Sequence, residues 1–137
     1  MIHSMAHAVV YVLNHEEAKE FYVDKLGLEV KTDVTVGSFR WLTVGTPEQP
    51  DLEIALMELK PGGPIKEEHV PLFKKIIEEG GMGTGVFRTH DCHGTYEQLK
   101  AKGVTFLSEP SEEPYGIEAT FADNSGNWFS LVQTPQS

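Results

Sequence analysis

A few side chains in this sequence have the types and spacing that could support chemistry in one site. His7 lies in an apolar run over 6–13 that is typical of a β-strand, and Glu53 lies in a second such run over 52–59. An imidazole and a carboxylate held together could act as an acid–base pair, or could supply two ligands to a divalent metal ion. Ser130, in the last apolar run of the chain, offers only a neutral hydroxyl.

The alternation of side chains along a strand predicts which other residues share a face with these positions. The residues expected to face a ligand are His7, Tyr11, Glu53, Met57, Arg88, Trp128 and Ser130. Val9, Ala55, Val86, His90 and Val132 fall on the same faces, and Thr84 opens the strand that contains Arg88. This mixture of aromatic, aliphatic and ionisable groups suits a pocket for a small organic molecule.

Plainer interpretations of the same residues stay open. His7 also fits a hydrogen-bonded structural histidine, and Arg88 also fits an ion-pair partner for Glu53 or another acid. Trp128 also fits a core or dimer contact. Cys92 is predicted to pack on a helix rather than to act as a nucleophile, because no activating partner is apparent.

The elements that must position these residues form a repeated pattern. Strands are predicted over 6–13, 28–33, 39–44, 52–59, 84–89, 104–107, 117–121 and 128–132. A helix is expected from the N-cap Asn14 to Gly27, and a second from a cap at His90 or Asp91 to Gly103. A short linker helix is expected to begin at Pro71.

The pattern β-α-β-β-β therefore occurs twice, with Gly27 and Gly103 related by an offset of 76 residues. We expect an α+β fold of two βαβββ modules, over about 3–59 and 84–134, joined by a linker over 60–83. Neither module could bury its helix and one sheet face well alone. The two together predict a single domain over 1–137 with a cup-shaped mixed sheet.

Charge and composition exclude several classes of partner. The chain carries 21 acidic and 11 basic residues, for a net charge of −10, so nucleic acid and anionic membrane surfaces are not expected partners. The single cysteine, the lack of a signal-peptide pattern and the lack of a long apolar stretch predict a cytoplasmic protein. Exposed-looking aromatics at Phe39 and Trp41, with the linker helix, predict a homodimer.

Three stretches of the chain resemble the vicinal oxygen chelate superfamily, which includes glyoxalase I, extradiol dioxygenases and bleomycin resistance proteins. They are His7-Ala-Val-Val-Tyr-Val-Leu-Asn with Ala18-x-x-Phe-Tyr-x-x-x-Leu-Gly27, Tyr96-x-x-Leu-x-x-x-Gly-Val104, and Tyr115-Gly116 leading to Asp123-x-x-Gly-Asn127. The resemblance covers about 3–133 and implies the glyoxalase-like fold and, in many members, a divalent metal ion held in the cup of the sheet.

Carrying the family's ligand positions onto this chain gives a mixed set. The resemblance implies ligands at His7, at Glu53 or Ala55, at Thr84 and at Ser130. Hydroxyl groups at the last two positions replace the stronger His and Glu ligands, which leaves at most His7 and Glu53 for a metal.

The ligand count favours a metal-free, bleomycin-resistance-like protein that binds a small organic molecule and needs no cofactor. The alternative is a divalent-metal-dependent lyase or extradiol dioxygenase-like enzyme with an atypical site at His7 and Glu53. A metal-free acid–base catalyst that uses the same pair is a further enzyme hypothesis, and the sequence assigns no catalytic residue.

Overall fold

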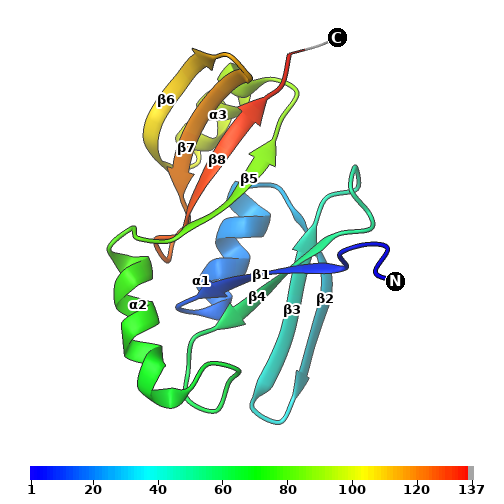
Figure 1. Cartoon of the computed structure of the whole chain (residues 1–137), viewed down its shortest axis with the longest axis vertical. Coiled ribbons are helices and arrows are strands. Elements are labelled where there is room, and N and C mark those ends of the chain that lie inside the picture. Colours follow the sequence, from blue (N-terminus) through cyan, green and yellow to red (C-terminus); the bar gives the residue numbers. More distant parts are fainter. Residues whose placement is uncertain (136–137) are drawn as a thin grey trace. The chain divides into compact units, whose positions relative to one another are not determined.

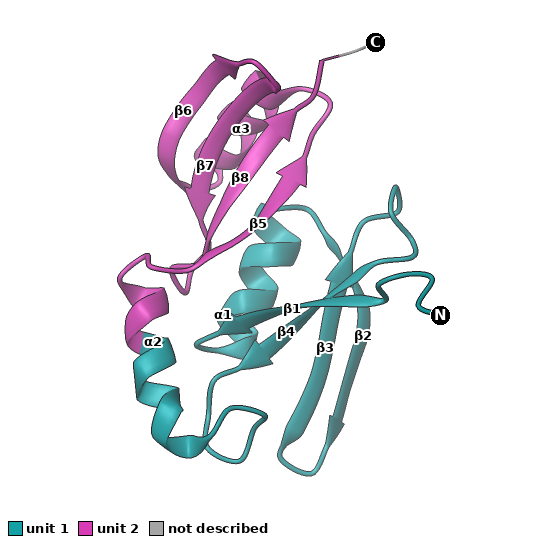
Figure 2. Ribbon diagram, viewed as in Figure 1, with its two compact units in different colours: residues 1–74 teal, residues 75–137 magenta. Residues whose placement is uncertain are grey.

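The computed structural model describes residues 1–135 and divides the chain into two compact units (Figure 2). Unit one comprises Met1–Lys74 and unit two begins at Lys75, so the boundary falls inside a helix. The single domain predicted over 1–137 stays a prediction, and its residues 136–137 lie outside the described residues.

Unit one contains a four-stranded mixed sheet and its helices (Figure 1). Its elements are β1 (His7–Val12), α1 (His15–Lys19), a π-helical turn (Glu20–Lys25), β2 (Glu29–Val36), β3 (Phe39–Gly45), β4 (Glu53–Glu58), a 3₁₀ turn (Glu67–His69) and the start of α2 (Val70–Glu78). The strand order is β1-β4-β3-β2, in which β1 runs parallel to β4 and the other neighbours are antiparallel.

Unit two repeats this arrangement. Its elements after α2 are β5 (Gly83–Arg88), α3 (Cys92–Ala101), β6 (Thr105–Glu113), β7 (Gly116–Ala122) and β8 (Trp128–Gln133). The strand order is β5-β8-β7-β6, again with a parallel outer pair. The predicted α+β fold of two βαβββ modules is therefore confirmed, and its strands form two four-stranded mixed sheets, one in each unit.

Polar caps and glycines set the ends of the two principal helices. The Asn14 side chain accepts a hydrogen bond of 2.9 Å from the Glu17 backbone N–H, and Asp91 accepts one of 3.0 Å from Gly94. Asp91, not His90, is thus the second cap. Gly27 and Gly103 both have positive φ, at 79° and 91°, which a side chain would disfavour.

The two modules differ by one residue inside the helix. Gly27 comes thirteen positions after the cap Asn14, whereas Gly103 comes twelve positions after Asp91. The π-helical turn over Glu20–Lys25 accommodates the additional residue, because its hydrogen bonds span one residue more than those of an α-helix. The caps are therefore related by an offset of 77, while the terminal glycines keep the offset of 76.

Each sheet buries one face beneath its helix. In unit one the residues buried there include Val10, Val12, Ala18, Phe21, Tyr22, Leu42, Val44 and Leu56. His15 is also buried there, with Nε2 lying 2.7 Å from the Leu56 carbonyl oxygen and Nδ1 lying 3.3 Å from Glu58. In unit two, Phe87, Phe121 and Phe129 pack together, with ring centroids 4.9 to 6.2 Å apart.

The linker helix differs from the sequence prediction. Helix α2 begins at Val70 rather than at Pro71, because a 3₁₀ turn leads directly into it. Val70 and Ile77 are buried, whereas Leu72 and Ile76 are exposed. No helix within residues 1–135 is both long enough and apolar enough to span a membrane.

An ion-pair network holds α1 of unit one against its sheet, and it should make stability depend on pH. Arg40 contacts Asp33 through two hydrogen bonds of 2.8 Å and also pairs with Glu16, while Lys19 lies 3.1 Å from Asp33. The Arg40 guanidinium holds the pKa of Asp33 well below its ordinary range, with a smaller contribution from Lys19 and against the opposing effect of burial. The ionised carboxyl therefore stabilises the fold above its unfolded pKa of about 3.9.

We expect Asp33→Asn to lower the free energy of unfolding by about 1 kcal/mol near neutral pH, since solvent screens this network. The difference from the natural protein should narrow as the pH falls below about 4 towards the depressed folded pKa. Urea unfolding across that pH range measures it, and Asp51→Asn, at an exposed site, is the matched control. A loss that stays constant with pH would contradict this role of Asp33.

Candidate functional site

The face of the unit-one sheet opposite α1 carries exposed apolar side chains. Pairing of β1 with β4 sets His7 beside Glu53, Val9 beside Ala55 and Tyr11 beside Met57. The pairs Thr43 with Ala55, Trp41 with Val34 and Phe39 with Val36 extend this face across β3 and β2. We call this set the open face. Four of its large apolar residues are exposed, namely Val9 (51%), Val34 (51%), Val36 (71%) and Phe39 (45%).

A polar cluster lies at one end of the open face. The Thr43 hydroxyl donates a 2.6 Å hydrogen bond to Oε1 of Glu53, and Nε2 of His7 lies 3.8 Å from the same oxygen. The side chains of His7 and Glu53 are 37% and 30% exposed, so a ligand could reach both. Thr43 itself is fully buried, and its hydrogen bond therefore orients the carboxylate.

An aromatic row crosses the same face. The Trp41 ring lies 5.2 Å from the His7 ring in an edge arrangement and 6.4 Å from the Phe39 ring in a stacked one. His7 on β1 and Trp41 on β3 are separated by β4, and their rings meet above that strand. On this face β4 carries the small residue Ala55 between Glu53 and Met57. This arrangement gives a planar molecule an aromatic surface next to a carboxylate.

The structure settles several sequence predictions within unit one. His7, Tyr11, Glu53 and Met57 share the open face, as the alternation predicts. The register that the sequence left open is also fixed, because Glu53 and not Ala55 pairs with His7. The Tyr11 ring lies 6.1 Å from that of Phe73, a residue of α2.

Sequence reasoning missed two residues of the open face. Trp41 was expected at a dimer contact and Thr43 was not considered, although both neighbour the His7–Glu53 pair. The available signal was the antiparallel pairing of β3 with β4, which places alternate residues of 39–45 on the face of Glu53.

In unit two the corresponding face is more polar. Val86 pairs with Ser130 and Arg88 with Val132, so Arg88 and Ser130 share a face as predicted. Ser130 is nevertheless buried, with 7% exposure, and on its other side it pairs with Thr120 of β7. Arg88 is exposed.

Thr84 and Trp128 have structural contacts in unit two. The β5–β8 register shifts between Gly83 and Gly85, so Thr84 lies at an irregularity of the strand, and its place on the face of Val86 and Arg88 stays a prediction. The Thr84 hydroxyl lies 3.1 Å from the Asn127 side-chain oxygen and 3.2 Å from the Met82 carbonyl oxygen. Trp128 is half-buried, and its indole lies close over the backbone of Gly83.

The turn before β8 explains the Asp-x-x-Gly-Asn sequence. One carboxylate oxygen of the buried Asp123 accepts hydrogen bonds of 2.9 Å from the backbone N–H groups of Ser125, Gly126 and Asn127. Its other oxygen accepts one of 3.0 Å from the Asn127 side chain. This motif therefore fixes the conformation of the turn. The Asn127 side-chain oxygen also accepts a hydrogen bond from the Thr84 hydroxyl near the start of β5.

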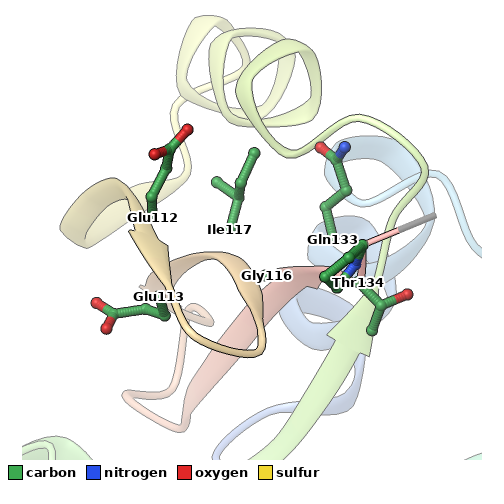
Figure 3. A pocket seen from close by; sticks show the side chains of 7 residues that line it. Glu112, Glu113, Gly116, Ile117, Gln133 and Thr134 are labelled. Carbon is green, nitrogen blue, oxygen red and sulfur yellow. The ribbon is translucent and has the colours of Figure 1, made fainter. Parts of the chain in front are cut away.

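Two further features of unit two lie outside the predicted site. Figure 3 shows a pocket at the β6–β7 hairpin that is lined by Glu112, Glu113, Gly116, Ile117, Gln133, Thr134 and Pro135, none of them a predicted site residue. Cys92 is fully buried, and its thiol lies 3.6 Å from the Leu131 carbonyl oxygen. Burial raises the pKa of Cys92, which agrees with the predicted packing role and disfavours a thiolate nucleophile.

The residues present do not fit a three- or four-ligand metal site of the kind that the resemblance implies. Unit one offers His7 and Glu53, whereas the unit-two positions carry the neutral hydroxyls of Thr84 and Ser130. The Thr84 hydroxyl is already engaged with Asn127. Across residues 1–135, no three His, Cys, Asp or Glu side chains gather where they could hold a metal ion.

The chain belongs to the Glyoxalase/Bleomycin resistance protein/Dioxygenase superfamily, whose family model matches residues 4–131. Among its relatives is YurT, an uncharacterized protein of Bacillus subtilis (strain 168). YurT is 38% identical over 124 residues, which cover 90% of this chain and 94% of YurT.

Solved structures of similar proteins include that of UcmS2. UcmS2 is 43% identical, with a TM-score of 0.91 over 96% of this chain and 98% of its own. TnmS3, described as an antibiotic binding protein from Streptomyces sp. CB03234, is 27% identical, with a TM-score of 0.77 over 98% of both chains.

The contact between Trp128 and Gly83 can be tested by adding one methyl group. A Cβ atom at Gly83 would come within 2.5 Å of the indole, whereas a Cβ at Gly85 would meet Phe129 at an ordinary 3.6 Å. We expect Gly83→Ala to lower the free energy of unfolding by about 1–3 kcal/mol. Gly85→Ala in the same strand should be close to neutral. Denaturant unfolding of both variants provides the measurement, and equal stabilities would show that Trp128 does not occupy this position.

Proposed function

We propose that this protein binds a small aromatic organic molecule without a metal ion, and that the open face of unit one is the binding surface. The observation that carries the proposal is the aromatic row of His7, Trp41 and Phe39 beside the oriented carboxylate of Glu53. Apolar walls with a few placed polar groups are typical of ligand sites. Leaving this much apolar surface in water is costly unless a partner covers it.

Similarity to other proteins supports the same function. The superfamily includes bleomycin resistance proteins, and TnmS3, at 27% identity, is described as antibiotic binding. A ligand of comparable chemistry, an aromatic or amphipathic natural product, suits the open face. The proposed role of the protein is then to bind and sequester such a molecule.

The donor chemistry supports binding without a metal cofactor. Two ligands at His7 and Glu53 leave most of a divalent ion's coordination sphere to water, and hydroxyl groups add little to affinity. The alternative function, a metal-dependent lyase or dioxygenase, requires further ligands that positions 84 and 130 do not supply.

Thermal unfolding with and without ligand tests the proposal. Naphthylmethanol, a planar neutral probe, should raise the melting temperature by the same amount in the presence or absence of a chelator, because a ligand stabilises by RT ln(1 + [L]/Kd). Added Mn²⁺, Ni²⁺ or Zn²⁺ alone should shift it little. Trp41→Ala should weaken probe binding about ten-fold, the effect of losing an aromatic contact.

Leu107→Ala, at an exposed apolar position of unit two, is the control for Trp41→Ala and should leave binding unchanged. His7→Ala should alter probe binding more than it alters folding. Tight binding of one divalent ion that is lost in His7→Ala would instead favour the metal-dependent enzyme.

Assembly and location stay predictions. Leu72 and Ile76 on α2, with exposures of 58% and 45%, supply apolar surface for the predicted homodimer. We expect light scattering at micromolar concentration to give the mass of two chains, and Leu72→Glu to shift that mass towards one chain. A natural protein of monomeric mass would contradict the homodimer. The predicted cytoplasmic location awaits a cell-fractionation experiment.

A further inference from the structure

The charges around the open face indicate what kind of ligand it selects, an inference that rests on the proposed function. Glu53 places a negative charge beside the aromatic row, with one oxygen held by Thr43. The nearby cations have other partners. The aliphatic part of the Lys31 side chain packs beside Gly45, and its ammonium group lies 3.4 Å from the Glu29 carboxylate. The Lys60 ammonium group donates a 2.6 Å hydrogen bond to the Ser38 carbonyl oxygen.

The remaining charged groups of this sheet lie on its helix side. Arg40 alternates with Trp41 along β3, and it pairs with Asp33 and with Glu16 of α1. Among the described residues of the open face, the ionisable groups next to Trp41 are therefore His7 and the half-buried Glu53 carboxylate, whose nearest atoms lie 3.8 Å apart. The carboxylate accepts hydrogen bonds without donating any.

We infer that the open face selects planar aromatic molecules that carry a protonated amine, with Glu53 as the residue that determines this specificity. A charge-assisted hydrogen bond from an ammonium group to a carboxylate is stronger than one from a neutral hydroxyl. An anionic ligand would be repelled by Glu53 and by the net charge of −10 on the chain.

Three naphthalene probes of similar size test this inference by calorimetry at low ionic strength. Naphthylmethylamine is cationic, naphthylmethanol is neutral and naphthylacetate is anionic. We expect affinity to fall in that order, with the amine binding at least about ten-fold more tightly than the acid.

Glu53→Gln removes the charge and keeps the shape of the side chain. This variant should lose most of the amine-over-acid preference, since it removes the charge-assisted hydrogen bond to the ammonium group. Glu17→Gln, at an exposed position of the helix layer, removes the same charge elsewhere and should keep the preference. Thr43→Val, which frees the carboxylate, should reduce the preference in part and keeps the test usable if Glu53→Gln fails to fold.

The outcomes separate this inference from the proposed function. If the probes bind and Trp41→Ala weakens all three, but neither Glu53→Gln nor Thr43→Val changes the amine-over-acid ratio, the selectivity assigned to Glu53 is wrong. An equal change in Glu17→Gln would assign the preference to net charge and would also overturn it. If no probe binds the natural protein, the proposed function and the inference both fail.

Discussion

The parallel pairing of β1 with β4 is the constraint on which the chemistry of unit one depends. These strands are separated by forty residues of chain, and their register sets His7 directly beside Glu53. Because side chains alternate, the same register sends Val10, Val12 and Leu56 into the core beneath α1. A slip of one residue would move Glu53 to the buried side and lose both arrangements together.

Two histidines show how the environment of a residue separates structure from function. His15 is buried, and its ring contacts Leu56 and Glu58, so its contacts are satisfied within the fold. His7 remains more than a third exposed, beside a carboxylate and an indole ring. In unit two, the Thr84 hydroxyl contacts the Asn127 side chain, and Ser130 is paired with Thr120 inside the sheet. The ionisable pair is therefore left with an aromatic surface rather than with further metal ligands.

Most of the fold could be predicted from the sequence because its signals are local. Asn14, Gly27 and Gly103 mark helix ends through their own backbone preferences, and alternating apolar residues mark the strands. The second half of β6 carried no such signal. Its residues after Leu107 are polar, and they form a strand because β7 pairs with them.

The site was less predictable because it depends on pairing between distant strands. Glu53 and Ala55 are equally good candidates until β1 is aligned with β4, and Trp41 joins the site only through the pairing of β3 with β4. The register shift between Gly83 and Gly85 of β5 adds one residue that no local pattern reveals. Long-range register and single-residue insertions therefore limited the prediction more than the chemistry did.

The most direct test of the account is a crystal structure of the protein grown with naphthylmethylamine and without added metal. The account predicts the naphthalene ring against Trp41 and the amine nitrogen within hydrogen-bonding distance of Glu53. A metal ion bound by His7 and Glu53, or a probe bound elsewhere with the open face empty, would contradict it.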